Sequence, residues 1–214
     1  VTGSDGDIGA EVLTGAEINA SLARDRAAGA EAREDDKPLR YWLPLVIGDT
    51  ADLEIRLPPG VEPSAVRLRL TRVSHLFALP FTRPGETFGG SNDCHRHVAC
   101  IDHPLVQQLA RATAILLYVV PGGGSNACTG TLLADSDPET RIPYLLTAHH
   151  CVPDQRQAST VETYWLHQAD GCGGRPDAAP VRVSGGADLL FARKTIDTAL
   201  LRLRRSAPAG AVFA

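Results

Sequence analysis

The stretch Thr147-Ala148-His149-His150-Cys151 decides how the second half of this chain is interpreted. An aspartate, Asp197, follows further along the chain, in Asp197-Thr198-Ala199-Leu200-Leu201. In serine catalysis a histidine takes the proton of the nucleophile, and a carboxylate on the far ring nitrogen fixes the tautomer and stabilises the imidazolium. His150 and Asp197 can fill these two roles only if the fold brings two distant strand ends together.

The sequence around this stretch is a series of short apolar segments separated by Gly, Pro and Asp turns. Such a series, without alternating helices, is typical of a β-sandwich or β-barrel. Strands are predicted at Ala114 to Val120, Ala127 to Ala134, Pro143 to Thr147, Thr160 to Leu166, Val181 to Val183, Leu189 to Ala192 and Ala199 to Leu203.

The leading part of the chain begins with a helix signal. Thr14-Gly15-Ala16-Glu17 has the form of a capping box, which predicts a helix to about Ala28 with Gly29 placed to end it. Apolar and polar residues then alternate at 51–57 and 66–70, so two half-buried strands are predicted on either side of a Pro-Pro-Gly turn. The leading part is thus expected to be a small β-rich unit with one helix.

Residues 81–90 carry Pro84, Gly85, Gly89 and Gly90, a composition typical of an exposed linker. The cysteines begin directly after it. We therefore predict a domain boundary near residue 90, with one domain at 1–90 and the other at 91–214.

Composition excludes two classes of partner. The net charge is -4 with acidic and basic residues interspersed, which leaves no basic face for nucleic acid. No apolar run approaches the roughly 18 to 20 residues of a membrane helix.

The chain lacks methionine and starts with Val1, so we expect both ends to be cut, with a signal peptide removed or not included.

Five cysteines, all in the second part, are spaced as in secreted disulfide proteins rather than as a CxxC pair. They are Cys94, Cys100, Cys128, Cys151 and Cys172. Spacing alone leaves their connectivity open. Because the number of cysteines is odd, one cysteine cannot pair within this sequence. It must be a free thiol, form an intermolecular bond, or pair with a cysteine in a segment outside this sequence.

Several local patterns occur together in one order. They are Cys94 and Cys100, then Ala127 to Leu132, Pro143 to Cys151, Tyr164-Trp165 followed by Cys172, and Asp197 with Leu200 to Leu203. In this combination, residues from about 91 to the end resemble the first half of a bacterial trypsin-like serine protease of the lysyl endopeptidase branch.

The resemblance implies an all-β fold in which the leading β-rich domain precedes one six-stranded antiparallel trypsin-type barrel, without its second barrel. It implies that the histidine directly before the cysteine, His150, is the base, that Asp197 is its partner, and that His149 is only a neighbour. It also implies disulfides joining Cys128 to Cys151 and Cys100 to Cys172.

For the rest of the protein, the resemblance implies that Cys94 bonds to the second barrel, which also carries the serine and packs on residues 91–214. We expect the serine half to be absent, because the sequence stops at Ala214 before any Gly-Asp-Ser-Gly-like segment. A secreted bacterial endopeptidase of protein or peptide substrates follows, with no cofactor. Residues 1–90 resemble a pro-region or accessory domain.

Three other interpretations compete. The barrel could be a non-catalytic binding module derived from a protease. The cluster from Cys94 to Cys100, with His95, His97 and nearby His103, offers zinc ligand types, although its spacing matches no common zinc pattern. Ser184-Gly185-Gly186 resembles the tail of a serine motif, but it precedes Asp197, against the order of the fold. Gly122-Gly123-Gly124 is interpreted as a hairpin turn.

Overall fold

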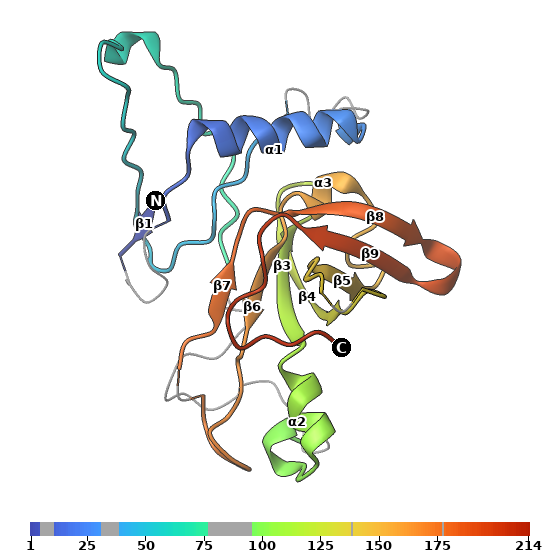
Figure 1. Ribbon diagram of the computed structural model, residues 1–214. Coiled ribbons are helices and arrows are strands. Elements are labelled where there is room, and N and C mark those ends of the chain that lie inside the picture. Colours follow the sequence, from blue (N-terminus) through green and yellow to red (C-terminus); the bar gives the residue numbers. More distant parts are fainter. Residues whose placement is uncertain (5–10, 31–38, 77–95, 138, 177) are drawn as a thin grey trace.

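The computed structural model describes residues 1–4, 11–30, 39–76, 96–137, 139–176 and 178–214 (Figure 1). Its main feature is one antiparallel sheet of seven strands in the order β7-β6-β3-β4-β5-β9-β8. The strands are β3 (Thr113–Val119), β4 (Ser125–Leu133), β5 (Tyr144–Thr147), β6 (Glu162–Trp165), β7 (Val181–Val183), β8 (Ala187–Arg193) and β9 (Thr198–Leu203).

All seven strands predicted from residue 114 onward are present, so the mostly β prediction is confirmed. The specific prediction of a six-stranded barrel is not confirmed, since the sheet has seven strands. In the described part of the chain, no ladder pairs β7 with β8, and a closed barrel is not seen. Among the described residues, three α-helices accompany the strands: α1 (Gly15–Ala27), α2 (Pro104–Ala110) and α3 (Gln155–Ala158).

The two edge strands of the sheet, β7 and β8, are consecutive in the chain and are connected by residues 184–186. Gly186 fixes this connection. Its N–H donates to the Val161 carbonyl at 3.2 Å, and its carbonyl accepts from the Arg204 N–H at 3.1 Å. Gly186 has φ +78°, and a Cβ there would lie 2.3 Å from the Ser159 carbonyl oxygen, so only glycine fits without movement. The sheet must therefore curve strongly to keep its edges this close.

The core lies on the inner face of the curved sheet. Alternate residues of β9 are buried, and Leu201 is fully inaccessible together with Leu116, Leu132, Leu145 and Trp165. The last residues extend this core, because Phe213 packs against it and the Ala214 N–H donates to the Leu132 carbonyl at 3.0 Å.

The leading part has much less sheet than its pattern predicts. β1 (Thr2–Gly3) pairs with β2 (Ala51–Asp52), and no further strand is present at 53–57 or 66–70. Leu68 and Leu70 are 59% and 67% exposed. An alternating pattern provides an apolar face, but a strand also needs a neighbouring strand for its backbone hydrogen bonds, and among the described residues no strand pairs with these segments.

The helix prediction is confirmed. The Glu17 N–H donates to Thr14 Oγ1 at 3.1 Å, and the Thr14 N–H donates to Glu17 Oε2 at 2.8 Å, which is the reciprocal capping box. Gly29 follows the helix with φ +76°. The buried residues of α1 are polar, Ser21 and Asp25, so this helix packs through hydrogen bonds and charges rather than an apolar stripe.

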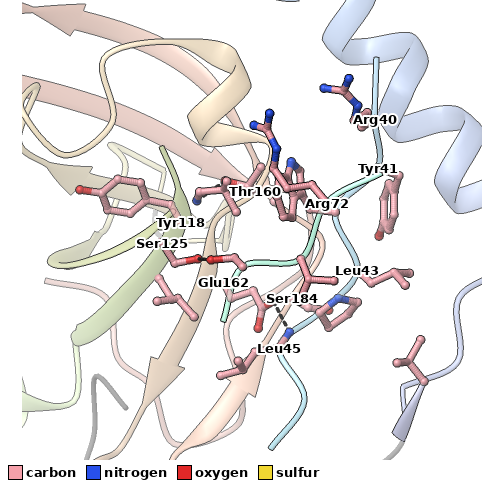
Figure 2. A pocket seen from close by; sticks show the side chains of 18 of the residues that line it. Arg40, Tyr41, Leu43, Leu45, Arg72, Tyr118, Ser125, Thr160, Glu162 and Ser184 are labelled. Carbon is pink, nitrogen blue, oxygen red and sulfur yellow. Dashed lines mark hydrogen bonds between the residues drawn. The ribbon is translucent and has the colours of Figure 1, made fainter. Parts of the chain in front are cut away.

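The leading part lies against the sheet at β6, which is buried on both faces. The Leu45 N–H donates to Glu162 Oε1 at 2.7 Å (Figure 2). The Tyr164 hydroxyl donates to Glu162 Oε2 at 2.9 Å. Burial raises the pKa of Glu162. A cavity of about 900 Å³ remains between residues 39–46 and the sheet.

A second contact involves α1. Arg204, whose side chain is 4% exposed, donates to Asp25 Oδ1 at 2.6 Å, to Ser21 Oγ at 2.7 Å and to Asp188 Oδ1 at 2.8 Å. The helix is therefore anchored where β9 ends. The predicted linker at 81–90 lies outside the described residues, and the boundary near residue 90 stays a prediction.

Candidate active site

Strands β5 and β9 set the position of the candidate pair. Thr147, the last residue of β5, is paired with Ala199 near the start of β9. In an antiparallel pair the end of one strand lies beside the start of the other. His150 follows β5 in a turn, and Asp197 directly precedes β9, so residues distant in sequence meet where the end of β5 lies beside the start of β9.

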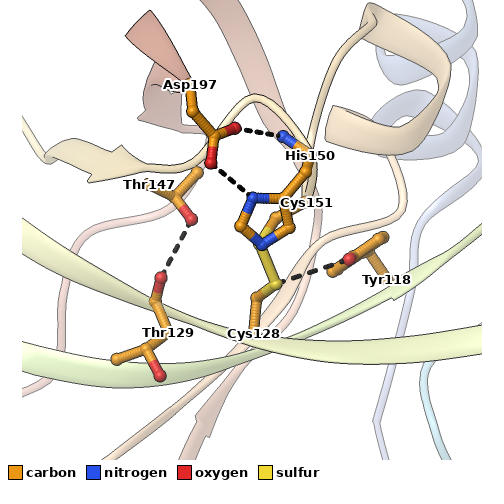
Figure 3. Close-up of a disulfide and its surroundings, with 7 residues drawn as sticks. All are labelled: Tyr118, Cys128, Thr129, Thr147, His150, Cys151 and Asp197. Carbon is orange, nitrogen blue, oxygen red and sulfur yellow. Dashed lines mark hydrogen bonds and ion pairs between the residues drawn. A yellow bond between two sulfur atoms is a disulfide. The ribbon is translucent and has the colours of Figure 1, made fainter. Parts of the chain in front are cut away.

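The two side chains are hydrogen-bonded (Figure 3). His150 Nδ1 lies 2.7 Å from Asp197 Oδ2, and the His150 backbone N–H donates to Asp197 Oδ1 at 2.9 Å. Asp197 adopts a left-handed conformation, φ 45°, at the end of the short turn Lys194–Ile196. One residue thus engages both carboxylate oxygens, which fixes the imidazole relative to the carboxylate.

The electrostatics of the pair favour an ionised carboxylate. The side-chain hydrogen bond from His150, followed by the bond from its backbone N–H, holds the pKa of Asp197 below its ordinary value. Both side chains are open to solvent, at 70% exposure for His150 and 54% for Asp197. With the carboxylate accepting from Nδ1–H, Nε2 is the nitrogen available to accept a proton.

A disulfide braces the turn that carries His150. Cys128 on β4 is bonded to Cys151, and the Tyr118 hydroxyl lies 3.5 Å from Cys128 Sγ. The Thr147 hydroxyl donates to the Thr129 carbonyl at 2.9 Å. β4 therefore holds the turn both covalently and through a hydrogen bond.

The second disulfide joins Cys100, in the short helical turn Val98–Cys100, to Cys172, which lies between β6 and β7. Both bonded pairs are those that the resemblance implies. Cys94 lies outside the described residues, as does His95.

Cys100 cannot serve as a zinc ligand in the cluster from Cys94 to Cys100, because its sulfur is bonded to Cys172. In the described ranges, the group with metal-ligand atoms close together comprises Cys128, His150 and Cys151. Its two sulfurs are bonded to each other, and zinc binds thiolates rather than disulfide sulfurs. This cluster is therefore part of the His150 turn and offers no zinc site.

The Ser184-Gly185-Gly186 segment, which resembles the tail of a serine motif, has a different role. Ser184 is 4% exposed, its hydroxyl donates to the carboxylate of Glu11, and it accepts from Arg205 Nη1 at 2.9 Å. It is bound within the contact between the leading part and the sheet.

Gly122 and Gly123 both have positive φ in the turn between β3 and β4, as predicted for a hairpin.

Comparison with known proteins adds to this geometry. Residues 88–214 match the family described as lysyl endopeptidase, C-terminal domain, and residues 1–77 match the lysyl endopeptidase N-terminal domain. The chain belongs to the lysyl endopeptidase family. A lysyl endopeptidase of Pseudomonas aeruginosa is 34% identical over 184 residues, which is 81% of this chain and 39% of that protein.

The chain thus spans about two fifths of the length of the lysyl endopeptidase that it resembles. The two disulfides and this relative fit an extracellular protein. Among the residues that the structure describes, no helix has the length and apolar character needed to span a bilayer.

Sequence reasoning missed the contact between the two parts of the chain. Its members are Glu11, Asp25, Arg182, Arg204 and Arg205, all ordinary interspersed charges in the sequence. No local pattern marks them, because each partner is more than 150 positions away from the other.

Proposed function

We propose that this chain contributes the base and its orienting carboxylate to a secreted serine endopeptidase. His150 is the general base and Asp197 its partner. The observation that carries the proposal is the 2.7 Å contact between His150 Nδ1 and Asp197 Oδ2, in a turn that the Cys128–Cys151 disulfide attaches to the sheet.

The chemistry follows from this arrangement. His150 Nε2 takes the proton of a serine hydroxyl as its oxygen attacks the scissile carbonyl, and Asp197 stabilises the imidazolium that forms. The imidazolium then gives the proton to the leaving amine, which departs and leaves an acyl-enzyme. Water, deprotonated by the same imidazole, attacks the ester carbonyl. The imidazolium returns this proton to the serine oxygen as the ester bond breaks and the acid is released.

We propose further that residues 91–214 form the first barrel of a trypsin-type pair and that the serine lies in a second barrel outside residues 1–214. The short 184–186 connection between the edge strands supports a barrel-like closure. Leu146, Leu200 and Phe191 lie side by side on β5, β9 and β8, and Leu146 and Phe191 are 39% and 43% exposed. This apolar row, close to the His150 and Asp197 pair, is where the second barrel is expected to pack.

The substrate proposal rests on the relatives. A relative that aligns with most of this chain is named a lysyl endopeptidase, so we propose cleavage at lysyl bonds of proteins and peptides. Turnover of matched lysyl and arginyl peptide esters by the full-length protein tests this. Equal rates on both would contradict lysyl specificity and leave the triad proposal standing.

A serine-directed phosphonate tests the reaction class. The full-length protein should be labelled at one serine outside residues 1–214, whereas residues 1–214 alone should show neither labelling nor ester hydrolysis, because they hold the base without the nucleophile. Absence of labelling and turnover in the full-length protein would favour the non-catalytic binding module. Stoichiometric labelling at Ser184 would overturn the order of the triad.

A further inference from the structure

The carboxylate of Glu11 is bound by three side chains that come from the sheet. Arg182 of β7 donates from Nη2 to Oε2 at 2.9 Å, and Arg205, beyond the end of β9, donates from Nη1 to Oε1 at 2.6 Å. The Ser184 hydroxyl also donates to Oε1. Each carboxylate oxygen thus accepts from an arginine, and one accepts from a hydroxyl as well.

The side chains of Glu11 and Arg182 are shielded from solvent, at 13% and 10% exposure, whereas that of Arg205 is 36% exposed. Charge-assisted hydrogen bonds are stronger where water is excluded, and two guanidinium groups brought together need an anion between them. The same Arg205 also approaches Glu17 at 3.5 Å, but that carboxylate is 50% exposed and lies at the rim.

We infer that Arg182, Ser184 and Arg205 form a carboxylate-binding site on the sheet, and that the leading part is anchored by filling it with Glu11. The site belongs to the sheet, because its three members lie within a short span of the chain after residue 181. A small free carboxylate is expected to occupy it when the Glu11 side chain is removed.

The site is separate from the candidate catalytic pair. Asp197 precedes β9 and Arg205 follows it, and the six residues of β9 span about 20 Å in a strand.

The site also gives Ser184-Gly185-Gly186 a role. Gly186 fixes the backbone, and a Cβ on Gly185 would lie 3.3 Å from Arg205 Nε, so the glycines let the arginine approach the serine.

Chemical rescue of Glu11→Ala tests the inference, with residues 1–214 as the purified protein. The variant should lose roughly 5–10 °C in melting temperature, because the shielded guanidinium of Arg182 loses its carboxylate partner and Arg205 keeps only the exposed Glu17. Sodium acetate at about 100 mM should restore at least half of that loss, whereas sodium chloride at equal ionic strength should not. The unsubstituted protein should gain no more from acetate than from chloride.

Glu17→Gln is the matched control, since it removes the exposed charge beside the same Arg205 and leaves a side chain that can complete the capping box with Thr14. It should lose less than about 2 °C and show no preference for acetate. The double variant Glu11→Ala with Arg182→Ala should not be rescued. If Glu11→Ala does not fold in chloride, the yield of folded protein on dilution from urea into acetate rather than into chloride is the measurement, and equal yields contradict the site.

Three results would overturn the site. They are a Glu11→Ala variant as stable as the unsubstituted protein, rescue by chloride equal to rescue by acetate, and acetate rescue that persists without Arg182. Any of them would mean that the contacts are an ordinary ion pair without carboxylate recognition.

Discussion

At the scale of single residues, two carboxyl groups show how environment sets their chemistry. Asp197 is open to solvent, and hydrogen bonds from His150 hold its pKa below the ordinary value. Glu162 is buried between β6 and residues 39–46, and burial raises its pKa. The first is suited to remain charged beside an imidazole, whereas the second resists ionisation.

The candidate pair yields a kinetic prediction for the full-length protein. His150→Ala and Asp197→Asn should each lower kcat/KM by roughly 10⁴-fold, because one removes the base and the other its orientation. His149→Ala should change it by less than about tenfold. Peptide-ester kinetics of the three folded variants check this. An inactive His149→Ala beside a near-normal His150→Ala would reverse the assignment, and three fully active variants would refute the protease proposal.

Glu162 yields a pH prediction. Because its pKa is raised in the folded state, its contribution to stability is fully present below the unfolded pKa of about 4.3 and is lost as pH rises through the raised value. Glu162→Gln has no such titration and can still accept from the Leu45 N–H. The variant's melting temperature should therefore fall less than that of the unsubstituted protein between about pH 5 and pH 8.

Glu17→Gln is the control for this titration. Hydrogen bonds from Thr14 lower the pKa of Glu17, so its contribution changes only below about pH 4.3. It should leave the slope between about pH 5 and pH 8 unaltered. Equal slopes for Glu162→Gln and the unsubstituted protein would show that Glu162 does not titrate in this range.

At the scale of elements, alternation of apolar and polar residues predicted strands correctly where a neighbouring strand is present to pair with the segment. The segments at 114–120 and 199–203 correspond to β3 and β9, and the Thr14 capping box starts α1 where expected. The segment at 66–70 has the same alternation and forms no strand. Alternation reports which face is apolar, but whether another edge lies beside it depends on the rest of the fold.

The connection between the edge strands yields a stability prediction. Gly186 and Gly60 both have φ near +80°, but a Cβ would lie 2.3 Å from the Ser159 carbonyl at Gly186 and would meet nothing at Gly60. Gly60→Ala should cost about 1 kcal/mol from backbone strain alone. Gly186→Ala should cost roughly 1–3 kcal/mol more through the clash. Urea unfolding of both variants measures the difference, and equal losses would contradict the crowding at Gly186.

At the scale of the whole molecule, the candidate pair was within reach of sequence reasoning and the contact between the two parts was not. His150 and Asp197 each lie in a recognisable local pattern, next to Cys151 and before Leu200-Leu201. Glu11, Asp25, Arg182 and Arg204 lie in none. A long-range ion pair leaves no trace in local periodicity, so only the folded chain reveals it.

The covalent frame of the whole chain can be tested by peptide mapping under non-reducing conditions. Cys128 should be found with Cys151 and Cys100 with Cys172, as in the structure. In residues 1–214 alone, Cys94 should be free or capped, since we expect its partner in the second barrel. A bond from Cys94 to Cys128 or Cys151 would contradict the brace on the His150 turn.

The sequence distance between the two parts has a consequence for biosynthesis. The Leu45 to Glu162 bond spans 117 positions, the Arg204 to Asp25 bond 179 and the Arg205 to Glu11 bond 194. The leading part leaves the ribosome before its binding partners on the sheet, which are translated more than 100 positions later. Its docking through these bonds therefore follows the synthesis of the sheet strands. Until Arg205 has emerged, the nascent chain carries Glu11 and Asp25 without the arginines that bind them.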